Sequence, residues 1–245
     1  MAASTPILGL RFFDESLESA LEYTDHGGLF VFPSGPCLAE ADRDRAYYQA
    51  LEQSDYILVD SGFLSLLWRC IACIQLRRIS GYQFLKAFLQ YPSFKKSQSC
   101  FWVMPSQELT YIHLEWLQTQ NLTVNTKDYY IAPDYQRISI EDPNLLQLIA
   151  YQKPKYIIIA LGGGVQEKLG AFLKNNLEYK PTILCIGAAL AFLTGAQVRI
   201  PDWADRCYMG WLLRILSCPS LYLKRYFKAW RLVKLLVHYK EKSPF

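Results

Sequence analysis

Several patterns that mark common protein classes are missing from this sequence. Only 20% of its 245 residues are charged and 51% are hydrophobic, which excludes intrinsic disorder, because disorder needs low hydrophobicity and high net charge. No fixed short period recurs, which argues against a solenoid or a propeller. The longest uncharged stretch, Pro181–Val198, has 18 residues, near the minimum for a transmembrane helix. Because it contains glycines, threonines and a glutamine, it predicts a strand, a turn and a short helix in a soluble or peripheral protein.

Residues for metal or triad chemistry are also scarce. The three histidines are scattered, and no Ser-His-Asp set or His/Cys metal spacing can be assembled. Cys70 and Cys73 form a Cys-x-x-Cys pair without a second pair or a nearby histidine, so we expect core packing rather than zinc. Met1–Leu10 lacks a charged region followed by an apolar one. We therefore expect seven free, mostly buried thiols in a reducing compartment, and chemistry without a metal or cofactor.

What the sequence does contain is a basic end. Residues 199–245 carry ten Lys/Arg and three Asp/Glu, whereas residues 1–198 carry 16 and 19. This asymmetry favours an anionic membrane or a polyphosphate as partner and disfavours nucleic acid. It also suggests a boundary between an α/β catalytic domain over 1–198 and a helical appendage over 199–245.

The basic end has helical periodicity from Pro201 to about Lys240. One face of the predicted helix carries the apolar and aromatic residues Tyr226, Trp230, Val233 and Val237. Another face carries the basic residues Lys224, Lys228 and Arg231. A helix packed on the body with a solvated basic face is one interpretation. The favoured alternative is a helix that binds a membrane surface or an anion.

Short apolar runs alternate with helical patterns along the rest of the chain. Strands are predicted at Gly28–Pro33, Tyr56–Asp60, Cys100–Met104, Tyr129–Ile131, Tyr156–Leu161 and Thr182–Ile186. Helices are predicted over Ala39–Gln53, after Gly62, from a Ser106 cap to Thr119, and over Leu145–Gln152 and Gln166–Asn175. Such alternation predicts an α/β fold with a parallel sheet, right-handed crossovers and helices on both faces.

Ligands bind at the carboxyl ends of the strands in sheets of this kind. Three segments fall there: Phe32–Gly35, Asp60–Gly62 and Gly162–Glu167. The glycine run of the third lets backbone approach a ligand, and the helix that follows favours phosphate. Neither the dinucleotide fingerprint nor a Walker A lysine is present. Asp60 is either a general base toward a hydroxyl nucleophile or a cap of the next helix, and the residues alone leave both roles open.

Several segments resemble, in order, the motifs of the WecG/TagA/CpsF glycosyltransferases of bacterial surface-polysaccharide and wall-teichoic-acid synthesis. The family's Gly-x-Gly-x-Pro-Lys-Gln-Glu turn is similar to Leu161–Glu167, and its glycine-ended "flaG" segment to Ile186–Gly195. The remaining matches are Ser54–Gly62, Arg78–Gly81, Arg199–Trp203, Gly210–Arg214, Pro219 and Lys224–Tyr226. The resemblance covers nearly the whole chain.

The resemblance implies a Rossmann-like parallel sheet and an inverting, metal-independent transferase. Its donor would be a UDP-sugar that carries an N-acetylhexosamine-type sugar, ManNAc or a related one. Its acceptor would be an undecaprenyl-diphosphate-linked sugar at the inner, cytoplasmic face of the bacterial membrane, where the protein would be peripheral. Homo-oligomers fit this class as well.

Site residues also follow from the resemblance. Asp60 matches the family's proposed base, and Gln166 matches an active-site glutamine near the nucleotide-sugar. The substrate-binding set would be Ser34, Arg78, Gly81, Gly162, Gly163, Gln166, Glu167, Arg199, Arg214, Lys224 and Arg225. Guanidinium groups can neutralise the charge on a departing UDP without a metal.

The chain departs from the family's pattern at Phe32, Ser34, Val165, Ala191 and Gly210. Phe32 and Ser34, for example, stand in place of a Thr-x-Asn motif. A second hypothesis is therefore a divergent, non-catalytic member that binds a nucleotide-sugar or a glycolipid. A third, a nucleotide-binding α/β protein such as an oxidoreductase, rests on the glycine run alone.

Overall fold

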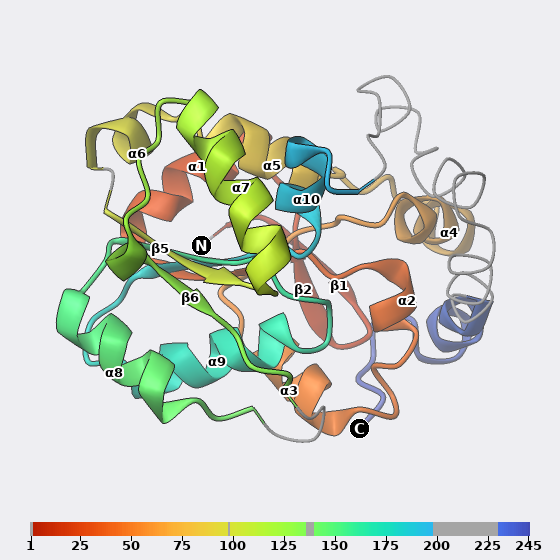
Figure 1. Ribbon diagram of the computed structural model, residues 1–245. Helices are drawn as coiled ribbons and strands as arrows, with labels where there is room; N and C mark the ends of the chain where they lie inside the picture. Colours follow the sequence, from red (N-terminus) through yellow and green to blue (C-terminus); the bar gives the residue numbers. More distant parts are fainter. Residues whose placement is uncertain (1, 98, 136–139, 198–229) are drawn as a thin grey trace.

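The computed structural model describes residues 2–97, 99–135, 140–197 and 230–245. Within them, eight strands form one sheet with helices on both faces (Figure 1). In spatial order the strands are β1 (Ser4–Ile7), β2 (Leu10–Phe13), β4 (Tyr56–Ile57), β3 (Gly28–Val31), β8 (Thr182–Cys185), β7 (Tyr156–Ile159), β5 (Cys100–Met104) and β6 (Tyr129–Ile131). Only β1 and β2 pair antiparallel. The predicted α/β class and parallel sheet are confirmed.

Two layers of helices cover the sheet. One apolar cluster includes residues of α2 (Gly35–Leu38), α3 (Arg45–Glu52), α4 (Gly62–Ala72), α8 (Pro143–Gln152) and α9 (Gln166–Asn176). The opposite cluster includes residues of α1 (Leu17–Tyr23), α5 (Gly81–Phe88), α6 (Pro92–Ser97), α7 (Gln107–Thr119) and α10 (Ala189–Thr194). Short 3-10 turns lie at Thr24–His26 and Thr126–Asp128.

Alternate residues of the central strands face opposite layers. In β7, Ile157 and Ile159 belong to the first cluster, whereas Tyr156 and Ile158 belong to the second. All four side chains are fully buried. This explains the unbroken apolar run in the sequence, because a strand covered on both faces has no solvent side on which a polar residue could lie.

Several predicted bounds differ from the structure by one or two residues, and three differences are larger. The helix expected over Ala39–Gln53 begins only at Arg45, because Asp44 caps it by accepting the Tyr47 N–H at 3.0 Å. The strand expected over Tyr56–Asp60 ends at Ile57, and Val59 pairs only in an isolated bridge with Arg78. The antiparallel pair β1 and β2 was not predicted, since each strand has only four residues.

The expectation of buried thiols is wrong for two cysteines. Cys70 and Cys73 are exposed, because α4 buries its opposite side, with Leu64 and Trp68, against the sheet layer. Cys185 is buried and donates its S–H to the Gln166 carbonyl at 3.2 Å. Cys37 and Cys100 are partly buried, and Cys207 and Cys218 lie outside the described residues.

Residues 230–239 are helical, as the periodicity predicted. Leu232 and Leu236 are fully buried in the first cluster. Arg231 donates to both carboxylate oxygens of Asp42, at 2.9 and 3.1 Å, so this member of the predicted basic face binds the body of the protein. Trp230 is 66% exposed and Val237 is 56% exposed. Tyr226, Lys224 and Lys228 lie outside the described residues.

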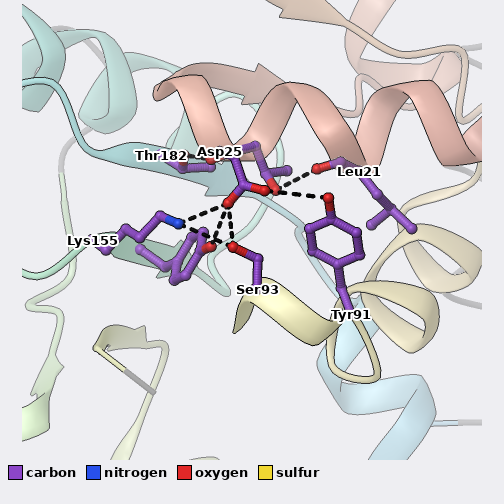
Figure 2. A network of polar contacts seen from close by, with 8 residues as sticks. Leu21, Asp25, Tyr91, Ser93, Lys155 and Thr182 are labelled. Atoms are coloured by element: carbon purple, nitrogen blue, oxygen red, sulfur yellow. Dashed lines mark hydrogen bonds and ion pairs between the residues drawn. The ribbon is translucent and has the colours of Figure 1, made fainter. Parts of the chain in front are cut away.

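A network of hydrogen bonds around Asp25 lies at the amino-terminal edge of the sheet (Figure 2). Asp25 accepts hydrogen bonds from Lys155 at 2.7 Å, Ser93 at 2.5 Å and Tyr91 at 3.2 Å. Burial opposes ionisation of Asp25, but hydrogen bonds from Lys155 and Ser93 outweigh it and hold its pKa below the usual value. Thr182 donates to the Thr24 carbonyl. These bonds join helices and strand starts, at the edge opposite to the strand ends where ligands bind.

The described helices include none that is both long and apolar enough to cross a membrane.

Close packing of α9 on the sheet gives a first prediction. A β-carbon on Gly170 would lie 2.8 Å from both Leu29 Cδ1 and Cys185 Sγ. We expect Gly170→Ala to lower the free energy of unfolding by about 1–3 kcal/mol, because overpacked cores must shift. Denaturant unfolding measures this change. Gly162→Ala is the control, since its β-carbon would meet nothing within 4 Å. Equal stability of Gly170→Ala and the wild type would contradict the predicted close packing.

Candidate active site at the carboxyl edge of the sheet

Asp60 lies just beyond β4 and faces the start of α5. Its Oδ1 accepts the Gly81 N–H at 2.9 Å, and its carbonyl accepts Arg78 Nε–H at 2.8 Å. The cap of α4 is Ser61, whose Oγ accepts the Leu64 N–H at 3.2 Å. Asp60 therefore does not cap the helix that follows it, the alternative that the sequence left open. Its partly exposed carboxylate sits instead beside the positive end of another helix.

A second part of the site follows β3. Ser34 donates its hydroxyl to Cys37 Sγ at 3.1 Å. A β-carbon on Gly163 would lie 2.6 Å from the same sulfur, so the turn after β7 touches the turn after β3. A β-carbon on Gly35 would lie 2.9 Å from Ser61 Oγ, which brings the ends of β3 and β4 together. A side chain at position 35 or 163 would therefore displace the Ser61 hydroxyl or the Cys37 thiol.

Gln166 and Glu167, the first residues of α9, hold the neighbouring turns. Gln166 Oε1 accepts the Gly187 N–H, just beyond β8, at 2.6 Å. Glu167 Oε2 accepts the Gly164 N–H at 2.6 Å, and Glu167 Oε1 accepts from Gln166 Nε2 at 3.2 Å. Both side chains are buried. Their hydrogen bonds shape the backbone that a ligand would meet, and neither side chain projects into solvent.

Glu167 is unusual because its carboxyl is fully buried. Burial raises its pKa to about 7, against the hydrogen bonds from its own N–H, Gly164 and Gln166, which favour the charged form. The charge of the neighbouring Lys168 also favours the charged form, and Lys168 Nζ donates to Asp44 Oδ2 at 2.8 Å. The turn at Gly162–Gly164 is therefore held by a hydrogen bond to the Glu167 carboxyl group, which gains or loses its proton near neutral pH.

The glycine turn itself is open. Gly162 and Gly163 are exposed, and β-carbons on Gly162 and Gly164 would meet nothing within 4 Å. No side-chain hydrogen bond caps α9, whose N-cap is Val165. An accessible glycine backbone at the start of an eleven-residue helix suits a phosphate group.

Eight predicted site residues lie in the described part of the chain and form one rim. Asp60, Arg78 and Gly81 adjoin each other, and a β-carbon on Gly81 would lie 3.4 Å from the Ile186 carbonyl, beside Gly187. Gly187 contacts Gln166, which contacts Glu167. The Gln166 N–H donates to the Gly162 carbonyl at 3.2 Å, and Gly163 and Ser34 both adjoin the Cys37 sulfur. The other four, Arg199, Arg214, Lys224 and Arg225, lie outside the described residues.

Two side chains at the rim were not predicted. Cys37 joins the turns after β3 and β7, and only its spacing of three residues from Ser34 hinted at this contact. Tyr47 is buried, and among the described residues its hydroxyl has no hydrogen-bond partner. Burial and the charges of Glu167, Cys37 and Asp44 raise its pKa. Nothing in the sequence pattern distinguished Tyr47 from an ordinary core residue of α3.

The described residues include no group of three or more His, Cys, Asp or Glu side chains that could hold a metal ion. What the rim does offer is a carboxylate, an arginine and an exposed glycine backbone at the ends of four adjacent parallel strands, β4, β3, β8 and β7. This arrangement defines an α/β protein with a phosphate-compatible site and an acid–base group at the carboxyl edge of its sheet.

Comparisons with known proteins identify the family. The model of the "Glycosyl transferase WecG/TagA/CpsF family" matches residues 5–244. The chain belongs to this family, and it is a glycosyltransferase.

Two similar relatives carry the name N-acetylglucosaminyldiphosphoundecaprenol N-acetyl-beta-D-mannosaminyltransferase. The protein from Bacillus subtilis (strain 168) is 25% identical over 223 residues, which is 87% of this chain and 83% of the relative. The protein from Staphylococcus aureus (strain MW2) is 23% identical over 251 residues, which is 95% of each chain. The resemblance inferred from the motifs is thereby confirmed.

Ionisation of the buried Glu167 gives a second prediction. An acid with a pKa near 4.5 when unfolded and about 7 when folded is neutral in the native state between these values. The unfolded state therefore binds fewer protons there, and stability falls as pH rises from 4.5 to 7. We expect Glu167→Gln to remove this fall, which urea unfolding at pH 5, 6, 7 and 8 measures.

The same pH series on Glu178→Gln is the control, because Glu178 is exposed and lies just beyond α9. A Glu167→Gln protein that loses stability with pH as steeply as the wild type would show that Glu167 titrates normally.

Proposed function

We propose that this glycosyltransferase moves an N-acetylhexosamine-type sugar, ManNAc or a related one, from a UDP-sugar to an undecaprenyl-diphosphate-linked sugar. The observation that carries the proposal is the position of Asp60, which among the described residues of the rim is the carboxylate that is partly exposed rather than buried. The names of the relatives support the acceptor and the sugar. The product would serve bacterial surface-polysaccharide or teichoic-acid synthesis.

In this proposal Asp60 is the general base. It takes the proton from the acceptor's sugar hydroxyl as that oxygen attacks the anomeric carbon of the donor. The carbon–oxygen bond to UDP breaks on the opposite face, so the configuration inverts. The Gly81 N–H and the start of α5 favour the negatively charged carboxylate that must act as the base.

The donor diphosphate would lie over the Gly162–Gly164 turn, where backbone is accessible. Gln166 and Glu167 keep the turns after β7 and β8 in place for it. Below pH 7 a neutral Glu167 adds no negative charge beneath the diphosphate. The departing charge would be neutralised by arginines rather than by a metal ion. Arg78 is the described arginine beside Asp60, and Arg199 and Arg214 are further candidates from the sequence.

The membrane position of the enzyme is also part of the proposal. A lipid-linked acceptor requires a peripheral enzyme at the cytoplasmic face, and the helix at 230–239 supplies an exposed Trp230 and a basic Lys234. Arg231 does not contribute to this surface, since it pairs with Asp42.

Substitution of the base gives a third prediction. Asp60→Asn keeps an Oδ1 that can accept the Gly81 N–H, so the fold should survive. Because an amide cannot take a proton, we expect acceptor-dependent UDP release to fall by about 100-fold or more. A coupled assay with a panel of UDP-sugars and a polyprenyl-diphosphate-sugar acceptor measures it. Thermal unfolding checks the fold, and unchanged turnover would exclude Asp60 as the base. Binding of UDP without any turnover of the wild type would favour the non-catalytic alternative.

Charge removal at the end of the chain gives a fourth prediction. Lys234, Lys240 and Lys242 are exposed, and each basic group near an anionic surface contributes about 1 kcal/mol. We expect their combined replacement by Gln to weaken binding to anionic vesicles by roughly 100-fold. Sedimentation with vesicles measures the partition. The matched control replaces exposed Lys95, Lys96 and Lys127, which changes the net charge equally. Equal losses in both triple variants would mean that only total charge matters.

A further inference from the structure

The outer side of α4 combines features that no other described helix of the body has. Leu66 is 47% exposed, and Ile74, just beyond the helix, is 40% exposed. Phe63, Leu67 and Ile71 of the same helix are only partly buried, where they pack against the first apolar cluster. An amphipathic helix normally turns such side chains inward, yet α4 already buries Leu64 and Trp68 on its inner side.

Charge distinguishes this surface from the other exposed apolar positions. Residues 62–78 contain three arginines and no acidic residue. Arg69 and Arg77 are exposed, and in the described part of the chain neither guanidinium has an ion-pair partner. The acidic side chains nearest in the described contacts are Asp14, which accepts the Arg77 backbone N–H at 3.0 Å, and Asp60.

The other described helices with exposed apolar residues lack that charge. On α7, Tyr111 and Ile112 are exposed, but the helix carries two glutamates and no Lys or Arg. On α8, Leu148 and Tyr151 are exposed, but the helix has no charged residue. Only the helix at 230–239, with Trp230 and Lys234, resembles α4 in this respect.

The helix α4 begins beside the proposed base and shares an apolar cluster with the C-terminal helix. The helix starts two residues after Asp60, with Ser61 as its cap. Its eleven residues span about 16 Å, and the chain beyond it returns to Asp60 at Arg78, whose Nε–H donates to the Asp60 carbonyl. Leu64 and Trp68 share one apolar cluster with Leu232 and Leu236 of the C-terminal helix. Figure 1 shows α4 and the C-terminal helix at the same end of the molecule, away from α6 and α8.

We propose that the outer side of α4, from Phe63 to Arg77, is a membrane-binding surface that docks on an anionic lipid bilayer beside Asp60. The inference rests in part on the proposed function, because a lipid-linked acceptor keeps its polyprenyl chain in the bilayer while its sugar must reach the base. Leu66 and Ile74 enter the boundary between head groups and acyl chains, and Arg69 and Arg77 contact lipid phosphates. The helix at 230–239 then supplies a second contact rather than the whole membrane surface.

The test measures co-sedimentation of the full chain with vesicles of 30% phosphatidylglycerol in phosphatidylcholine. Leu66→Glu and Ile74→Glu each place a negative charge on the proposed surface. We expect each to weaken vesicle binding by about fivefold or more. Leu148→Glu on α8 is the matched control, since Leu148 is 41% exposed against 47% for Leu66, and it should bind as the wild type does. Thermal unfolding establishes that each variant is folded.

Activity separates this inference from the proposed function. The Leu66→Glu variant should lose sugar transfer to a membrane-embedded undecaprenyl acceptor to the same extent as it loses vesicle binding. It should keep sugar transfer to a short-chain, water-soluble acceptor. If no variant and no wild type transfers sugar, while binding still depends on Leu66 and Ile74, the proposed function fails and the membrane surface stands.

Two results would overturn the membrane surface. One is vesicle binding by folded Leu66→Glu and Ile74→Glu that equals that of the wild type and of Leu148→Glu. The other is a Leu66→Glu or Ile74→Glu variant whose oligomeric mass in light scattering differs from that of the wild type while its vesicle binding is unaltered. That result would make α4 a contact between copies of the chain.

Discussion

Two buried side chains at the start of α9 support the rest of the candidate site. Gln166 accepts the Gly187 N–H and Glu167 accepts the Gly164 N–H, so one helix start fixes the turns after two neighbouring strands. Hydrogen bonds in such a low-dielectric interior are strong, and leaving one of these buried groups unpaired would be costly. The arrangement also carries a cost of its own, since burial of the Glu167 carboxyl raises its pKa to about 7. A phosphate-compatible turn thus depends on a group with no direct access to solvent.

The two edges of the sheet use polar residues in different ways. At the amino-terminal edge, the exposed Asp25 accepts hydrogen bonds from Lys155, Ser93 and Tyr91, which join separate elements of the fold. At the carboxyl edge, the Gly162–Gly164 turn is open and the Asp60 carboxylate is partly exposed. The first arrangement stabilises the junction of helices and strands, and the second leaves groups accessible to a ligand. The direction of the parallel strands accounts for this division, because it collects the strand ends at one edge.

The chemistry of a lipid-linked acceptor would restrict how this protein sits on a bilayer. In the proposed reaction Asp60 would have to approach the surface, so the elements beside it would be the ones that touch lipid. The outer side of α4 and the C-terminal helix combine exposed apolar groups with the exposed basic residues Arg69, Arg77 and Lys234, which form no ion pair among the described residues. Arg231 shows that a basic residue in such a helix need not face lipid, because Asp42 and Glu40 bind it to the body.

The sequence by itself determined the class of the fold, the family and the position of Asp60, because apolar runs, turn glycines and ordered motifs are local patterns. Cys100–Met104 and the Ser106-capped helix were predicted with their observed bounds for the same reason. Only the tertiary structure decided that Ser61 rather than Asp60 caps α4, that Gln166 and Glu167 are buried, and that Cys70 and Cys73 are exposed. These outcomes depend on which side of each helix meets the sheet and on contacts between turns distant in the chain. A pattern of neighbouring residues does not contain that information.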